Sequence, residues 1–253
     1  MFLIFPDSAS IADYVSAILV DKINNNPEVV LGLATGGTME PVYARFVEQV
    51  RRQQLDVSRL TSFNLDEYVG LSTGHPQSYS AYMQQHLFSH LPFDASQLHL
   101  PDGLTPDLDG HCQRYSETIR QCGGIALQLL GVGGNGHIGF NEPGTPFNSR
   151  CHVVQLSDVT RQDNGRFFDE PSTVPASAIT MGMQDIMEAG EILLIATGEK
   201  KAAVVAAFHR QAVTEALPMS MLKLHPRARI IVDDAAASLL PTEIRQQPLA
   251  VNG

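Results

Sequence analysis

Apolar residues along this chain occur in two patterns, as short continuous runs and as longer segments in which they recur every three or four positions. The continuous runs are typical of strands that are buried on both faces of a parallel sheet. The recurring pattern, seen at Ile11, Val15 and Ile18, is typical of a helix that buries one face. Because the two patterns alternate, the sequence predicts an α/β fold with a mostly parallel sheet and helices on both faces.

The boundaries of these elements follow from where the patterns stop. Strands are predicted over residues 2–5, 29–34, 60–65, 98–100, 125–130, 151–156, 191–196 and 229–232. Helices are predicted over residues 11–23, 39–52, 78–90, 107–121, 159–168 and 200–211. The chain contains no internal repeat, low-complexity tract or linker, so residues 1–253 are interpreted as a single domain.

The most unusual stretch is a glycine-rich loop, residues 131–144, which follows the predicted strand 125–130. Its glycines and Pro143 disfavour a helix or a central strand. In open α/β sheets, ligands bind at the carboxyl ends of strands, so this loop is a candidate site. His137 and Glu142 lie five residues apart in the loop, and a carboxylate paired with one ring nitrogen fixes the imidazole tautomer and raises its basicity. The pattern indicates that His137 is a general acid or base.

The same loop matches the GxGxxG dinucleotide-binding pattern at Gly131, Gly133 and Gly136. That pattern requires a helix to open at the last glycine, whereas residues 140–144 would break a helix there. A dinucleotide cofactor is therefore not expected.

Two other predicted strand ends carry candidate chemistry. Residues Thr35, Gly36, Gly37 and Thr38 offer backbone N–H groups and hydroxyls beside the start of a helix, which favours a phosphate site, although a purely structural glycine turn would look the same. The stretch lacks the Lys-Ser/Thr ending of a nucleotide P-loop. Asp66 ends another strand; its ordinary pKa, about 3.9, would leave it ionised and able to act as a base. A helix cap or a surface acid is the alternative for Asp66.

The amino-acid composition disfavours several classes of function and partner. The formal net charge is −10, which disfavours non-specific binding to nucleic acid, so an anionic substrate needs local cations. Arg166 and the Lys200–Lys201 pair follow predicted strands and are candidates, although each alone resembles a solvated surface charge. Three unpaired cysteines, no basic leader and no long apolar run predict a cytoplasmic protein without a membrane span. No spacing typical of metal ligands occurs, so no metal is expected.

Four stretches taken together resemble the glucosamine-6-phosphate deaminase (isomerase) family. They are residues 34–38, 65–69, 136–143 and 164–168, and the resemblance extends from about residue 2 to 235. It implies a Rossmann-like α/β fold and conversion of an amino-sugar phosphate into fructose 6-phosphate and ammonia, without a metal or cofactor. A small-molecule amino-sugar phosphate would be the partner, and a homo-oligomer is left open.

The resemblance also implies roles for individual residues. Asp66 matches the base that takes a proton from C2 and returns one at C1, and His137 matches the ring-opening catalyst with Glu142 as its partner. Asn135 stands where one branch of the family has an aspartate. The remaining matches are assigned to phosphate and substrate binding, and they are Thr35, Gly36, Gly37, Thr38, Gly136, Arg166 and Lys201.

These motifs indicate less about allosteric regulation and about which substrate the protein uses. His152 and Val154 stand where some family members carry the basic residues of an effector site, so we expect no allosteric activation. The alternatives are a galactosamine-6-phosphate deaminase, a 6-phosphogluconolactonase, and a non-catalytic sugar-phosphate sensor. Glu142 disfavours the lactonase, while the lack of a further domain or basic patch disfavours the sensor.

Overall fold

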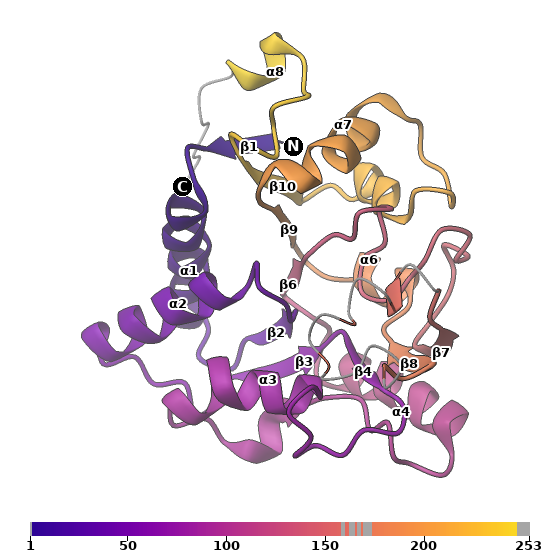
Figure 1. The fold of residues 1–253 in the computed structure, drawn as a ribbon. Helices are drawn as coiled ribbons and strands as arrows, with labels where there is room; N and C mark the ends of the chain where they lie inside the picture. Colours follow the sequence, from indigo (N-terminus) through magenta and orange to yellow (C-terminus); the bar gives the residue numbers. More distant parts are fainter. Residues whose placement is uncertain (1, 158–159, 162–164, 166–167, 169–173, 247–253) are drawn as a thin grey trace.

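The computed structural model describes residues 2–157, 160, 161, 165, 168 and 174–246. A seven-stranded parallel sheet forms its centre, in the order β1, β10, β9, β6, β2, β3, β5 (Figure 1). The strands are β1 (Phe2–Phe5), β2 (Val30–Leu33), β3 (Thr61–Asn64), β5 (Leu98–His99), β6 (Leu127–Leu130), β9 (Ile192–Ala196) and β10 (Ala228–Asp233). The predicted α/β fold with a mostly parallel sheet is confirmed.

Helices cover both faces of this sheet. In Figure 1 the strands follow one another down the middle of the view, with α1 and α2 on the left and α6 and α7 on the right. The α-helices whose bounds fall within the described residues are α1 (Ser8–Asn25), α2 (Glu40–Gln53), α3 (Tyr79–His86), α4 (Leu108–Gln121), α6 (Met183–Met187), α7 (Ala202–Arg210) and α8 (Thr242–Arg245). The described 3₁₀ helices are η1 (Phe88–His90), η2 (Ala95–Gln97), η4 (Glu199–Lys201) and η5 (Pro218–Leu224).

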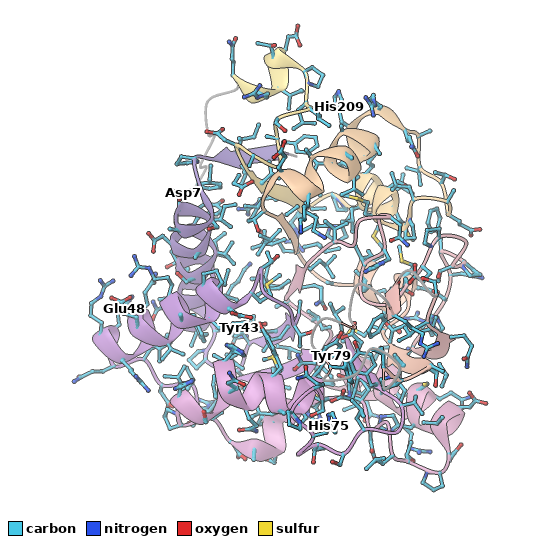
Figure 2. The ribbon with its side chains drawn as sticks, viewed as in Figure 1. Asp7, Tyr43, Glu48, His75, Tyr79 and His209 are labelled. Atoms are coloured by element: carbon cyan, nitrogen blue, oxygen red, sulfur yellow. The ribbon has the colours of Figure 1, made fainter. Side chains whose placement is uncertain are left out.

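Local sequence explains where the helices begin. The side chain of Asp7, labelled in Figure 2, accepts a hydrogen bond from Ser10 N at 2.7 Å and caps α1. Ser78 caps α3 in the same way through Ala81 N, at 3.0 Å. The helix predicted over residues 78–90 ends earlier, at His86, because Leu87 leaves the helical region with φ −141°. Most of the helix predicted over residues 159–168 lies outside the described residues.

A second, antiparallel sheet was not predicted. It consists of β4 (Asp66–Tyr68), β8 (Ser177–Thr180) and β7 (His152–Gln155), in that order. Only the last was predicted as a strand. The other two are three and four residues long and mix polar with apolar side chains, so no continuous apolar run indicates them. This small sheet extends the chain beyond the end of β3 and holds Asp66.

Two features do not occur among the described residues. No helix among them is long and apolar enough to cross a membrane. Nor does any group of three or more histidine, cysteine, aspartate or glutamate side chains in the described ranges have an arrangement that could hold a metal ion.

Candidate active site

A cavity of about 610 Å³ lies at the carboxyl ends of the central strands. Its walls come from the turns after β2, β6 and β9, from β4, and from one side of α3. The lining residues fall within the stretches 34–38, 65–68, 76–86, 131–140 and 197–201, with Glu40, Thr160 and Phe168 in addition. A concave site with a few converging polar groups at this position is where α/β proteins bind small ligands. The three strand ends singled out in the sequence therefore open onto one cavity.

Asp66 projects into the cavity from the first position of β4. It is only 7% exposed, and no hydrogen bond to its carboxyl group occurs within the described part of the chain. Burial, together with the neighbouring charge of Glu67, raises the pKa of Asp66 to about 8. The sequence-based expectation that an ordinary pKa leaves this group ionised at neutral pH is therefore wrong, because it ignored desolvation.

Glu67 has a different function in the same strand. Its carboxylate accepts hydrogen bonds from the backbone N–H groups of Tyr68, Tyr79 and Ser80, at 2.9, 3.0 and 2.9 Å. Two of these donors belong to the first turn of α3, so Glu67 caps that helix and ties it to β4. Figure 2 labels Tyr79 near this junction. The helix-cap alternative considered for Asp66 thus applies to its neighbour.

Thr180 connects the strand of Asp66 with the glycine-rich loop. It lies opposite Asp66 in the pairing of β4 with β8. Its hydroxyl accepts a hydrogen bond from Phe140 N at 3.1 Å and donates one to Met181 O at 3.2 Å. The buried amide of Asn141 donates to Met181 O as well, at 2.8 Å. These contacts fix the loop against the small sheet, so that Asp66 and the loop face the same cavity.

His137 lines the cavity from the loop, with Glu142 behind it. Nδ1 of His137 lies 3.7 Å from Oε2 of Glu142, which is an electrostatic contact rather than a hydrogen bond. Asn135 bridges the two residues, because its amide donates to Glu142 Oε2 at 2.7 Å and its carbonyl oxygen accepts from His137 N at 3.1 Å. The predicted pair is adjacent, and Asn135 acts on the ring through the backbone and through Glu142.

Two hydroxyl groups hold the other oxygen of Glu142. Ser157 Oγ donates to Oε1 at 3.2 Å, and Thr160 Oγ1 donates to the same oxygen. Burial alone would raise the pKa of Glu142, but the adjacent His137 and the bonds from Thr160 and Asn135 outweigh it and lower that pKa to about 2. Glu142 is therefore ionised at all physiological pH values. It offers His137 a fixed negative charge.

The turn after β2 forms another part of the cavity wall. Thr35, Gly36, Gly37 and Thr38 all line it, and Gly36 has φ +99°, a conformation that favours glycine. Tyr82 Oη, from α3, donates to Gly36 O at 2.9 Å and braces the turn. The following helix α2 starts without a side-chain cap, which leaves its first N–H groups near the cavity.

The predicted cations differ in their placement. Lys201 lines the cavity from η4, whereas Lys200 is exposed and is not among the lining residues. Arg166 lies outside the described residues. Gly136, predicted to bind substrate, is also not among the lining residues; it has φ +87°, and a Cβ there would lie 2.3 Å from Leu217 Cδ1. The backbone geometry gives Gly136 a structural function in the loop.

Comparison with known proteins places the chain in a family. Residues 8–231 match the family model described as glucosamine-6-phosphate isomerases/6-phosphogluconolactonase. The chain belongs to this family. The predicted resemblance is confirmed, and it now rests on most of the sequence rather than on four motifs.

Relatives distinguish the two branches of the isomerase/lactonase family. A glucosamine-6-phosphate deaminase of Rhodopirellula baltica is 50% identical over 237 residues, 94% of each chain. Another, from a Geobacillus species, is 47% identical and covers 90% of this chain and 91% of its own. The solved structure of a monomeric glucosamine-6-phosphate deaminase superposes with a TM-score of 0.92 at 40% identity, covering 94% of this chain and 99% of that one. A 6-phosphogluconolactonase of Trypanosoma brucei reaches a TM-score of 0.76 at 17% identity over 95% of this chain and 98% of its own, and thus shares the fold.

Several residues that line the cavity were not predicted from the sequence. Tyr68, Tyr79 and Phe140 form an aromatic wall beside Asp66, with Tyr79 Oη 3.5 Å from Tyr68 Oη and the rings of Tyr79 and Phe140 stacked 6.0 Å apart. His86, which belongs to none of the motifs in the sequence, also lines the cavity from α3. The spacing of Tyr82 and His86, one helical turn apart, is the signal that could have indicated a common face.

Gly133 provides a local test of the position of His137. A Cβ at Gly133 would lie 2.1 Å from His137 Cε1, so Gly133→Ala should push the ring out of place and lower kcat about 10–100-fold. Gly134→Ala is the matched control, since a Cβ there meets nothing within 4 Å. Steady-state kinetics and circular dichroism of both variants would check this. Equal losses in the two variants would mean that the loop, and not the ring, is sensitive.

Proposed function

We propose that this chain catalyses the isomerising deamination of glucosamine 6-phosphate to fructose 6-phosphate and ammonia. One observation carries the proposal: a buried carboxyl group with no partner among the described residues (Asp66) and a carboxylate-backed imidazole (His137) open onto the same cavity as a glycine-rich turn suited to phosphate. The deaminases that are about half identical to the chain over its length support it.

The first chemical step is opening of the cyclic sugar. His137 accepts the proton of the C1 hydroxyl and supplies one to the ring oxygen, so the C1–O5 bond breaks and an aldehyde forms. The anionic Glu142, 3.7 Å from Nδ1, stabilises the protonated imidazole between these two transfers. Asn135, Ser157 and Thr160 keep that carboxylate in place.

The second step is proton transfer between adjacent carbons. Asp66 takes the proton from C2 while O1 gains one from water, which converts the amino aldehyde into an enolamine, and Asp66 then gives its proton to C1 as the nitrogen releases one to solvent. The product is the C2 imine of fructose 6-phosphate, which water hydrolyses to the ketone and ammonia. Thr35, Gly36, Gly37, Thr38 and Lys201 would hold the phosphate elsewhere on the cavity wall, with Arg166 joining them on the strength of the sequence. Anchoring the phosphate orients C1 and C2 toward the base.

The decisive assay supplies the purified protein with glucosamine 6-phosphate and measures ammonia and fructose 6-phosphate together. Galactosamine 6-phosphate and 6-phosphogluconolactone are tested in parallel. Equimolar products from the gluco substrate alone are expected. Ammonia from galactosamine 6-phosphate alone would mean that the enzyme is specific for the other C4 epimer. Hydrolysis of the lactone without deamination of either amino sugar would overturn the proposal.

The pH dependence of this reaction follows from the raised pKa of Asp66. A base works only when ionised, and this carboxyl group loses its proton at about pH 8, so kcat/KM should fall about tenfold per pH unit below that value. Because the charge of Glu67 contributes to the shift, Glu67→Gln should move the fall to lower pH. A profile of kcat/KM from pH 5.5 to 8.5 measures this; a flat profile would exclude ionisation of Asp66 as the limiting event.

We also propose that the enzyme works in the cytoplasm, where phosphorylated sugars are retained by their charge, and that it is monomeric, as the solved relative is described to be. His152 and Val154 lie in β7, and they put one imidazole and one apolar side chain where an effector site would have basic residues. Hyperbolic kinetics, unchanged by an N-acetylated amino-sugar phosphate, are expected. Sigmoidal kinetics relieved by that compound would contradict the absence of regulation, and size-exclusion chromatography tests the monomer.

A further inference from the structure

Among the described residues, the surroundings of Asp66 contain no positive partner for its carboxyl group. Its carboxyl group is buried at the wall of the cavity, and within the described residues it has neither a hydrogen bond nor an ion pair. Glu67 follows it in β4, and the phenols of Tyr79 on α3 and Tyr115 on α4 are close enough for its charge to raise their pKa values. From the glycine-rich loop, Gly139 approaches so closely that a Cβ there would lie 3.5 Å from Asp66 Oδ2.

Among the described residues, no ionisable group that acts on Asp66 therefore favours its negative charge. Glu67 is acidic, the two tyrosines are neutral acids, and His137 on the loop already lies against the anion of Glu142. Lys201 lines the cavity from η4, but burial and Glu67 are the influences that act on the Asp66 carboxyl group. A buried carboxyl group without a cation or hydrogen-bond donor favours its neutral form.

We infer that the ammonium group at C2 of the substrate ionises Asp66 when it binds, so that the site recognises an amino sugar by the positive charge which its own base lacks. This inference rests on the proposed function, and it deepens that function by explaining the preference for an amine over a hydroxyl at C2. The substrate thus brings a positive charge to Asp66 that its described neighbours do not supply.

The proton balance of this event is simple. At pH 7 about nine in ten Asp66 side chains carry a proton, because the pKa is about 8, and a primary amine is largely protonated. When the ammonium group binds, Asp66 releases its proton to solvent and a carboxylate–ammonium pair forms beside C2. The base is then ready, and the adjacent positive charge also makes the C2 proton more acidic. A C2 hydroxyl group does neither, so Asp66 stays neutral opposite it.

Calorimetry with two unreactive probes tests the inference. 2-Amino-2-deoxyglucitol 6-phosphate and glucitol 6-phosphate lack a carbonyl group and differ only at C2. Titrations at pH 7 in buffers of different ionisation enthalpy give the number of protons released on binding. The amine should release close to one proton more than the alcohol, and this difference should disappear as the pH rises past about 8. Because both probes carry the same phosphate, its own ionisation cancels in the comparison.

Asp66→Asn is the matched variant, since it keeps the shape of the side chain and removes the ionisation. It should abolish the difference between the two probes. Equal proton release by both probes in the wild type, or a difference that persists in the variant, would overturn the inference. A second readout is kinetic: the acid limb of kcat should lie at least one pH unit below that of kcat/KM, because only the complex contains the ammonium group.

Failure of this inference is distinguishable from failure of the proposed function. If glucosamine 6-phosphate gives ammonia and fructose 6-phosphate but the probes release equal numbers of protons, the reaction stands and the recognition by charge is wrong. If the amine probe releases its extra proton but no ammonia forms from glucosamine 6-phosphate, the deaminase proposal is wrong instead.

Discussion

Replacement of Asp66 by asparagine is expected to lower kcat about 10²–10⁴-fold, the range that a positioned general base supplies. The amide has nearly the same shape but cannot accept the C2 proton. No hydrogen bond to the carboxyl group of Asp66 occurs in the described structure, so the substitution breaks no contact there. The proposed phosphate site is distant in sequence and unchanged, so a phosphosugar should still bind. Steady-state kinetics together with calorimetric binding would separate the two effects.

Stability provides the internal control for this variant. The native pKa of about 8 lies above the ordinary value of 3.8, so folding favours the protonated acid. The wild type is fully stabilised by this group below about pH 4 and loses that stability as the pH rises toward 8. Asp66→Asn should therefore unfold at the same temperature or higher, with an advantage that grows between pH 4 and 8. The exposed Asp234→Asn serves as a matched control that keeps wild-type turnover. Turnover that survives in Asp66→Asn would exclude this residue as the base.

The parallel sheet could be predicted because burial on both faces leaves an unmistakable pattern. The runs that became β2, β6 and β9 are apolar apart from Gln128 in β6, and topology then places their carboxyl ends together. The small sheet could not be predicted in this way. In β4, Asp66 and Tyr68 face the cavity while Glu67 caps a helix, so the strand is polar for functional reasons and carries no apolar signal.

The main residues of the candidate site could be predicted from the sequence, but the ionisation of Asp66 and the hydrogen-bond partners of Glu142 could not. Asp66, His137, Glu142 and the turn from Thr35 were all found by their place after strands. The ionisation of Asp66 was not, because the pKa of a carboxyl group depends on desolvation and on neighbours that come together only in the fold. The same holds for Ser157 and Thr160, which reach Glu142 from a later segment. Their hydroxyl groups have no sequence spacing that links them to it.

Glu142 shows why the site tolerates an amide at position 135. One carboxylate oxygen accepts a hydrogen bond from the amide of Asn135 and lies near His137. The other accepts hydrogen bonds from the hydroxyl groups of Ser157 and Thr160. These donors stabilise one anion, and its pKa of about 2 keeps the charge in place. A second carboxylate at position 135 would add repulsion to this arrangement, whereas the amide adds a donor. His137 therefore depends on a single, well-held negative charge.

Replacement of His137 by glutamine should remove catalysed ring opening and lower turnover about 10²-fold or more. The sharper expectation concerns how the rate depends on enzyme concentration. If His137 opens the ring, the variant can use only the open-chain sugar that forms spontaneously, and its rate will level off as more enzyme is added. The wild-type rate stays proportional to enzyme concentration over the same range. The exposed His90→Gln is the matched control and should behave like the wild type. A His137→Gln variant that is slow but still proportional to enzyme concentration would contradict the ring-opening role, because the ring would then be opening fast enough without the imidazole.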